Sequence, residues 1–159
     1  MPRKVTKSLE RKVSPDRKYQ SVLVQRLINK SMLDGKKQAA ERAVYAALEG
    51  AAKTLKSEDP VEVFEKALMN VSPDFEVKSR RVGGANYQIP FPISGHRQQH
   101  FAFSWLVQAA RERKGMPYSK RLELEIVDAY NEAGAAFKKK EDCHRMAEAN
   151  RAFAHFARA

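Results

Sequence analysis

The sequence predicts a mainly α-helical fold: a bundle of six helices with one projecting β-hairpin arm and a flexible basic N-terminal arm. Three observations support this prediction. Apolar residues recur at spacings of three and four along most of the 159 residues. Residues 75–93 break that period and place β-branched and aromatic residues on both sides of a Gly-Gly pair. Residues 1–15 show no period at all. The length fits a single domain, 1–159.

The N-terminal third is expected to contain an arm and two helices. Residues 1–15 carry repelling positive charges, so we expect an arm that is disordered alone and orders on binding. Apolar spacing predicts a helix over 19–33, and Gly35 follows it as a residue suited to the left-handed conformation that ends helices. A continuous stripe of alanine, valine and leucine then predicts a helix over 37–56.

A third helix and the hairpin come next. Asp59 is expected to cap a helix whose first position is Pro60, and the helix should end before Pro73. In residues 75–93, Gly83 and Gly84 supply the positive φ of a tight turn. Because no other segment offers strands and an isolated hairpin is marginal in water, we expect a projecting arm that is stabilised at its base and by its ligand.

Three helices are expected after the hairpin. The first covers 96–114, with Phe101 and Trp105 pointing inward. The second is capped by Ser119 and ends before Gly134. The third is expected from about Glu141 to Phe156, with an inner face formed by Met146, Ala147, Phe153 and Ala154.

The charge pattern indicates a polyanionic partner. The chain has 30 Lys and Arg against 19 Asp and Glu, a net charge of +11. Residues 1–30 hold nine basic residues and two acids, whereas residues 34–76 hold six basic residues and nine acids. Like charges held close together repel one another, and a polyanion would relieve that repulsion. No apolar run of about 18 residues is present, so no membrane partner is expected.

Catalytic and metal-binding patterns are weak. His96 and His100 have a metal-ligand spacing, but no Glu follows His96 and no third ligand is suggested, so an ordinary surface or RNA-facing pair is favoured. Cys143 and His144 are adjacent in a predicted helix, so their side chains should not face each other. The one cysteine excludes an intramolecular disulfide and is compatible with a reducing compartment. We therefore expect no enzyme, no metal and no cofactor.

Nucleic acid is the polyanion that the sequence favours. Arg and Lys neutralise phosphates, and the hairpin adds Asn86, Tyr87 and Gln88, which suit sugars and unpaired bases. Tyr87 could either stack on a base or pack against the opposite strand. Two alternatives are a DNA-binding regulator, which would need a polar recognition helix and a dimer seam, and a metal-dependent nuclease that uses His96 and His100.

Four blocks of the sequence resemble the family of the seventh protein of the small ribosomal subunit, bacterial type. They are EVKSRRVGGANYQIP at 76–90, LINKSMLDGKKQAAERAVYAAL at 27–48, RQQHFAFSWLVQAAR at 97–111 and KKKEDCHRMAEANRAFAHF at 138–156. The blocks are long, stand in the family's order and together span most of the chain.

The resemblance implies a primary rRNA-binding protein of the cytoplasmic small ribosomal subunit that takes part in translation. Family members bind the 3′ major domain of the rRNA and nucleate assembly of the subunit head. They lie at the subunit interface near the decoding centre, with the hairpin arm near the exit-site tRNA. The implied neighbours are the eleventh and ninth small-subunit proteins, and a homo-oligomer is not implied.

The resemblance also implies site residues by matching position. The rRNA contacts would be Arg3, Lys4, Lys7, Arg11, Lys36, Lys37, Lys78, Arg80, Arg81, Arg97, Gln98, Gln99, Lys138, Lys139, Lys140 and Arg145. The arm tip near the tRNA would be Gly83, Gly84, Ala85, Asn86 and Tyr87. The contact with the eleventh protein would be Asn150, Arg151, Phe153 and His155.

Overall fold

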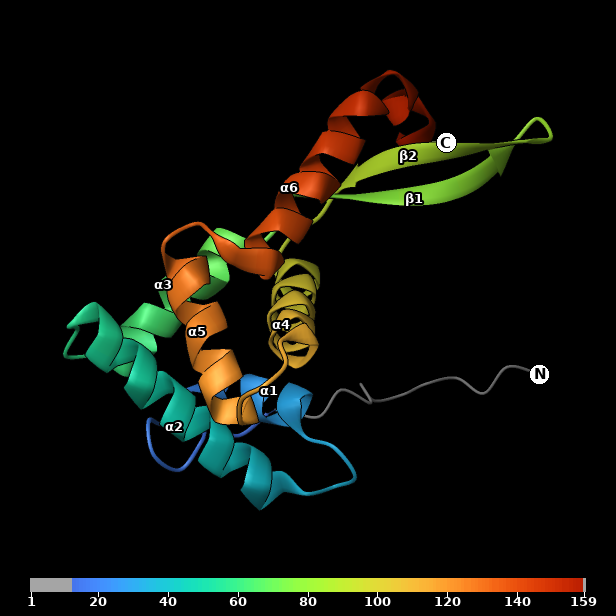
Figure 1. The fold of residues 1–159 in the computed structure, drawn as a ribbon. Helices are drawn as coiled ribbons and strands as arrows, with labels where there is room; N and C mark the ends of the chain where they lie inside the picture. Colours follow the sequence, from blue (N-terminus) through green and yellow to red (C-terminus); the bar gives the residue numbers. More distant parts are fainter. Residues whose placement is uncertain (1–12, 159) are drawn as a thin grey trace, which may run out of the picture.

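The computed structural model describes residues 13–158 and confirms the predicted fold class (Figure 1). Arg3, Lys4, Lys7 and Arg11 of the predicted basic arm lie outside the described residues. The elements, in chain order, are α1 (Val22–Ser31), α2 (Lys37–Leu55), α3 (Pro60–Val71), β1 (Phe75–Val82), β2 (Ala85–Pro92), α4 (His96–Glu112), α5 (Tyr118–Tyr130), α6 (Gly134–Ala149) and a 3₁₀ segment, η1 (Arg151–Arg158).

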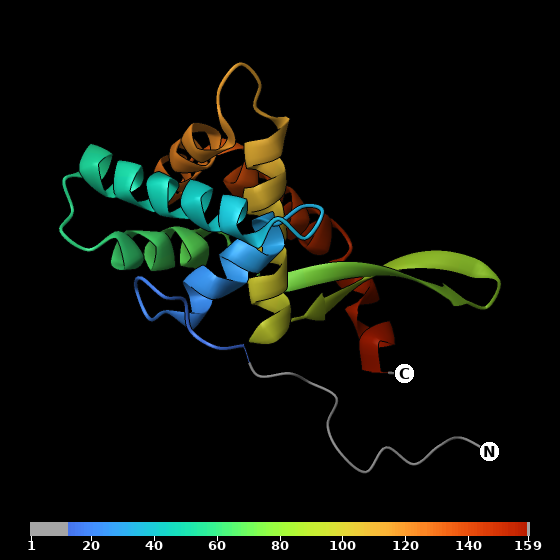
Figure 2. The same ribbon diagram turned by 90° about the horizontal axis from the view of Figure 1, so that it is seen from below.

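The core lies among α1 to α5, with α2 packed along α5 (Figure 2). The alanine stripe of α2 brings its backbone close to α5, since Ala47 and Ala51 are fully buried. Phe64 of α3 is also fully buried and its ring lies 6.2 Å from the ring of Phe103 on α4. Burying a side chain of that size contributes about 1.5–3 kcal/mol. The helical body is therefore a rigid support for the charged surface.

Local capping signals predict some helix boundaries correctly. Asp59 accepts a hydrogen bond from the backbone N–H of Val61 at 2.8 Å, and Pro60 is the first residue of α3, as expected. The expectation for Gly35 was wrong, because α1 ends at Ser31. Gly35 instead lies in the connection to α2 with φ +72°, where the turn needs a left-handed residue.

The C-terminal boundaries differ most from the sequence-based expectation. α5 begins after Pro117, so Ser119 lies inside its first turn and caps nothing. α6 begins at Gly134, seven residues before the predicted Glu141, and ends at Ala149, where η1 replaces the predicted α-helical continuation. The prediction that Met146 and Ala154 face inward was also wrong, because 53% of Met146 is exposed and Ala154 is exposed as well.

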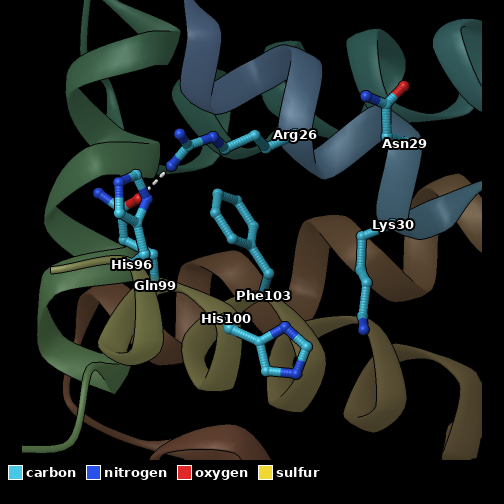
Figure 3. A pocket seen from close by; sticks show the side chains of 7 residues that line it. All are labelled: Arg26, Asn29, Lys30, His96, Gln99, His100 and Phe103. Carbon is cyan, nitrogen blue, oxygen red and sulfur yellow. Dashed lines mark hydrogen bonds between the residues drawn. The ribbon is translucent and has the colours of Figure 1, made fainter. Parts of the chain in front are cut away.

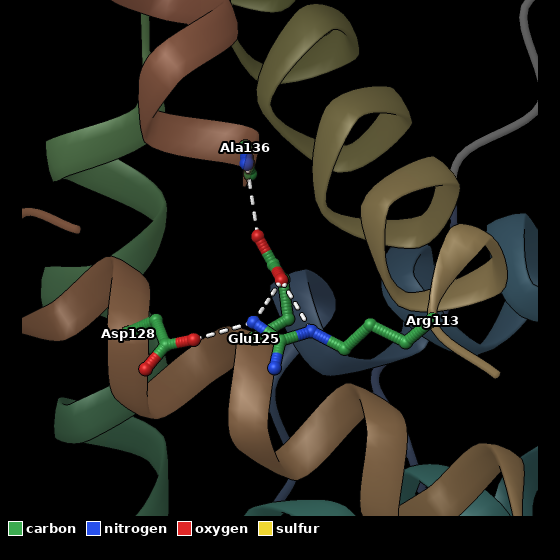
Figure 4. Close-up of polar contacts among 4 residues, drawn as sticks. All are labelled: Arg113, Glu125, Asp128 and Ala136. Atoms are coloured by element: carbon green, nitrogen blue, oxygen red, sulfur yellow. Dashed lines mark hydrogen bonds and ion pairs between the residues drawn. The ribbon is translucent and has the colours of Figure 1, made fainter. Parts of the chain in front are cut away.

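The early start of α6 depends on a buried carboxylate on α5 (Figure 4). Glu125 is fully buried and accepts a hydrogen bond from the backbone N–H of Ala136 at 2.8 Å. Its other oxygen accepts two hydrogen bonds from Arg113, at 2.9 and 2.7 Å, and Arg113 also pairs with Asp128. One carboxylate thus joins the end of α4, the middle of α5 and the first turn of α6.

Phe101 and Trp105 are only partly buried, rather than fully inside as expected. Their rings lie 5.3 Å apart, and Trp105 packs against the edge of the core. The buried face of α4 is formed by smaller side chains together with Phe103: Ala102, Leu106, Val107, Ala109 and Ala110.

The hairpin is an antiparallel pair that projects from the body, with α6 and η1 beside it (Figure 1). Phe75 pairs with Pro92 at its base and Val82 with Ala85 at its tip. The expectation that only its base and a ligand support the arm was incomplete, because η1 packs against β2.

Candidate nucleic-acid interface

A cavity of about 350 Å³ lies between α1 and α4 (Figure 3). Arg26, Asn29 and Lys30 line it from α1, and His96, Gln99, His100 and Phe103 line it from α4. Figure 3 shows the polar side chains arranged around the ring of Phe103, which is 5% exposed. Arg26 donates a hydrogen bond to the amide oxygen of Gln99, which fixes α1 and α4 side chains relative to each other.

The chemistry of this cavity suits an RNA backbone. Its lining has two cations, two imidazoles and two amides, and it has no carboxylate. Cations bind phosphates, whereas amides and imidazoles can hydrogen-bond sugars and base edges. Gln99 was a predicted contact, and the cavity places it with five polar residues that the predicted set did not contain: Arg26, Asn29, Lys30, His96 and His100.

The turn before α2 forms a second cationic surface. Lys36 and Lys37 line a cavity of about 530 Å³ with Arg42, one turn further along α2. Both lysines are exposed. The first turn of α2 has no acidic residue and no side-chain cap, so positive side chains stand at the positive end of the helix dipole. A phosphate at this position would remove that unfavourable interaction.

The arm base combines positive charge with one buried carboxylate. Glu76 is 6% exposed and accepts two hydrogen bonds from Arg97 at 3.0 and 2.9 Å, and it pairs with Lys78 at 2.6 Å. Burial alone would raise the pKa of Glu76, but the contacts with Lys78 and Arg97 outweigh burial and lower it. Glu76 therefore stays charged and holds Arg97 and Lys78 in place, while half of each cation remains exposed.

The remaining predicted contacts of the arm have differing partners. Arg80 lies over the ring of Phe91, with its guanidinium carbon 5.1 Å from the ring centre. Arg81 is exposed on the same strand. Gln98 donates to Asp74 at 3.3 Å, so its amide connects the start of α4 to the entry of the arm.

The predicted rRNA contacts on α6 differ in whether their side chains already have a partner within the protein. Lys138 is exposed. Lys139 pairs with Glu112 at 3.3 Å, and Arg145 pairs with Asp142. Lys140 donates to the backbone carbonyl of Asn70 at 2.7 Å and so connects α6 to the end of α3. Within this group, Lys138 is the residue best placed to bind an external phosphate.

The arm tip and the C-terminal contact residues lie together. Gly83 and Gly84 have φ +57° and +91°, as the predicted turn requires, and Ala85 and Asn86 are exposed. Tyr87 stands opposite Arg80 in the strand register, but its ring contacts Phe153 and Phe156 of η1.

The other C-terminal residues stabilise the end of α6. Asn150 caps the helix and donates to the carbonyl of Met146 at 2.8 Å, and Arg151 pairs with Glu148 at 3.4 Å. His155 is exposed, and its ring stacks beside that of Phe156.

Other kinds of site have little support in the part of the chain that the structure describes. Among residues 13–158, no three His, Cys, Asp or Glu side chains are grouped as metal ligands would be. Within the same range, no helix combines the length and apolar character needed to cross a membrane. Cys143 is half-buried and its thiol contacts the carbonyl of Phe75 at 3.2 Å; burial raises its pKa, as does the charge of Glu76.

One known protein family has a sequence pattern that matches nearly the whole chain. A sequence model for the family described as ribosomal protein S7p/S5e matches residues 2–151. The chain belongs to this family. The S7p/S5e relatives include small ribosomal subunit protein uS7 of Dictyoglomus turgidum, which is 56% identical over 146 residues, covering 92% of this chain and 93% of the relative. The uS7 proteins of Chloroflexus aurantiacus and Thermomicrobium roseum are each 52% identical, over 159 and 156 residues that cover at least 98% of both chains.

Membership of the S7p/S5e family confirms the resemblance drawn from the four sequence blocks. It gives the protein a structural, non-enzymatic role as a component of the cytoplasmic small ribosomal subunit. It also implies binding to small-subunit rRNA and to other ribosomal proteins, and so participation in translation.

Proposed function

We propose that the protein binds the 3′ major domain of small-subunit rRNA directly and nucleates assembly of the subunit head. The observation that carries this proposal is the α1–α4 cavity, where Arg26 and Lys30 meet His96, Gln99 and His100 without an acidic neighbour in the lining. Segments some 70 residues apart in the chain converge there, and the turn before α2 adds Lys36 and Lys37. Together they present fixed cations to a folded RNA.

Binding requires no chemical reaction. The packed helices fix the positions from which the cations project before RNA arrives, so little backbone entropy is lost on binding. Each phosphate that is neutralised releases counterions, which gives affinity but no sequence information. Selectivity then depends on whether the phosphates of a folded junction match the spacing of the cations, and on hydrogen bonds from amides such as Asn29 and Gln99.

The arm and the C-terminal segment extend these contacts to other partners. We propose that the tip, Gly83 to Tyr87, approaches the exit-site tRNA at the subunit interface near the decoding centre. The exposed tip residues and the length of the arm support this placement. We further propose that Asn150, Arg151, Phe153 and His155 contact the eleventh small-subunit protein, and that the ninth is a second neighbour.

Nuclease footprinting on small-subunit rRNA tests the proposed function. The double variant Arg26→Gln/Lys30→Gln should lose protection of the 3′ major domain and weaken binding by at least about 10-fold, as expected for lost phosphate contacts. Lys53→Gln/Lys56→Gln is the matched control, because it removes two exposed charges at the other end of α2, where Lys53 lies about 24 Å along the helix from Lys37. Equal affinities for the double variant and the control would contradict the role of the α1–α4 cavity.

A chain that lacks residues 76–90 separates the body from the arm. It should keep most of its rRNA footprint through the body but lose protection near the exit-site tRNA. An unchanged footprint in the deletion variant would show that the arm is passive.

A further inference from the structure

The tip of the arm and the C-terminal segment, residues 150–156, form one aromatic cluster. The ring of Tyr87 lies 5.1 Å from that of Phe153 and 5.5 Å from that of Phe156, at angles of 54° and 36°. Offset and tilted ring pairs at these distances are favourable beyond the area that they bury. Two regions that were predicted to serve different partners are therefore in contact with each other.

The arm needs support beyond its base. In the described chain its sheet has two strands, and such a hairpin is marginal in water when isolated. At the base, His144 accepts a hydrogen bond from the backbone N–H of Asp74 at 3.0 Å, and Glu76 holds Arg97. These contacts all lie within three residues of the start of the arm. Tyr87 lies in the outer half, only three residues from the Gly-Gly turn, and η1 supplies the ring contacts there.

The segment that supplies these contacts is itself weakly held. η1 is an eight-residue 3₁₀ helix, longer than is usual for a geometry with poor hydrogen bonds. A cavity of about 820 Å³ separates its Ala154 and Arg151 from Phe75 and Phe91 at the arm base. The ring contacts between η1 and the arm therefore lie near the tip, on the far side of this cavity from the base.

We propose that Phe153 and Phe156 are positioning residues that brace the arm, so that RNA bound at the arm tip and order in the C-terminal segment favour each other. The proposal rests on the proposed RNA-binding function of the arm. An arm that is already ordered loses less backbone entropy when RNA binds, which raises its affinity. Since coupling between two sites is reciprocal, RNA at the tip must also stabilise η1.

Hydrogen exchange of the free, full-length protein tests the brace directly. In the variant Phe153→Ala/Phe156→Ala, the amides of residues 79–88 should exchange at least about 5-fold faster, while those of α2 and α5 keep their rates. Ala152→Ser is the matched control, because Ala152 is exposed in the same segment and carries no ring. Tyr87→Phe should keep slow exchange, since it retains the ring, whereas Tyr87→Ser should reproduce the double alanine variant.

Binding measurements test the coupling. On subunits reconstituted with each variant, protection of exit-site tRNA should fall about 5-fold or more in Phe153→Ala/Phe156→Ala, but not in Ala152→Ser. In the unaltered protein, addition of tRNA to those subunits should slow exchange of residues 151–158. Affinity for the 3′ major domain of small-subunit rRNA should be the same in all of these variants.

Three results would overturn the proposal: equal exchange in the double variant and the control, tRNA protection that rises when the rings are removed, or η1 exchange that does not respond to tRNA. A rise in tRNA protection would mean that η1 blocks access to the arm instead of stabilising it. Loss of rRNA binding by the unaltered chain would instead contradict the proposed function, and the exchange rates of the free protein would still decide whether η1 braces the arm.

Discussion

Asp16 attaches the segment before α1 to the helical body. It is 1% exposed and accepts hydrogen bonds from three backbone N–H groups, those of Lys18, Tyr19 and Ser21, at 3.0, 2.8 and 2.8 Å. The hydroxyl of Tyr45 on α2 donates a fourth at 3.2 Å. Burial would raise the pKa of Asp16, but these hydrogen bonds outweigh burial and lower it.

Asp16→Asn should destabilise the protein by about 1–3 kcal/mol at pH 7, because the amide cannot accept with both of its terminal atoms. The folded pKa lies below its ordinary value of 3.8, so the stabilisation is complete above that pH and is lost as the pH falls through the folded value. Urea unfolding should show that the difference in unfolding free energy between wild type and variant is smaller at pH 3 than at pH 7. Asp59→Asn is the control, since asparagine caps a helix as well as aspartate does. An equal difference in unfolding free energy at both pH values would contradict a stabilising role for the charged Asp16 carboxylate.

The run Lys138 to Lys140 shows what charge counting alone misses. The sequence presents three equivalent cations, whereas the structure leaves Lys138 exposed and uses Lys140 to bind the carbonyl of Asn70. Which lysine of a run meets a carbonyl depends on the packing of α6 against α3, and no local pattern encodes that packing.

Lys138→Gln and Lys140→Gln should therefore have different effects. Lys140→Gln should lower the unfolding free energy by about 1.5–3 kcal/mol, the range for hydrogen bonds to charged groups. Lys138→Gln should leave stability within about 0.5 kcal/mol and reduce only RNA affinity. Thermal unfolding and filter binding measure the two quantities, and equal melting temperatures for both variants would refute the distinction.

At the scale of elements, the start of α6 is set by tertiary contacts rather than by local capping. The sequence predicts a helix start at about Glu141, yet Glu141 lies in the middle of α6. The true start at Gly134 depends on the buried carboxylate of Glu125, which comes from another helix. By contrast, the cap of α3 lies within its own sequence at Asp59 and Pro60, so it could be predicted.

Gly134→Ala should destabilise the protein more than Gly115→Ala. Both glycines have positive φ, +88° and +82°, so both substitutions carry the same backbone strain of about 1–2 kcal/mol. A Cβ at Gly134 would also lie 2.9 Å from the Cβ of Asp128, whereas a Cβ at Gly115 would meet nothing within 4 Å. Chemical denaturation of the two variants gives the comparison. Equal losses of unfolding free energy would show that the α5–α6 connection can shift to accommodate the added Cβ.

At the scale of the whole molecule, the bundle, the hairpin and the charged surfaces near Lys36 and Arg97 were predictable from periodicity, turn residues and family resemblance. The α1–α4 cavity was not. Arg26 and Lys30 were counted within a basic run, and His96 and His100 were interpreted as an ordinary surface or RNA-facing pair, with no link between the two segments. Their meeting depends on how α1 crosses α4, which is decided by core packing and has no signature in either segment alone.

Affinity for rRNA should depend steeply on salt. If the cationic surfaces neutralise about eight phosphates, affinity should fall by about 10³–10⁵ between 50 and 200 mM monovalent salt. Filter binding at several salt concentrations gives the slope, and Arg26→Gln/Lys30→Gln should reduce it by about two phosphates. A slope near zero would contradict binding through the phosphate backbone.

The separation of Tyr87 and Phe153 in the chain has a consequence for synthesis. The two positions are 66 residues apart in the sequence, and ribosomes add about 5–20 residues per second. The nascent hairpin therefore emerges about 3–13 seconds before the phenylalanine that contacts it. During that interval the ring of Tyr87 lacks its partners on η1 and the edges of the hairpin are uncovered, so a new copy is more exposed to association with other chains until residue 153 has been made.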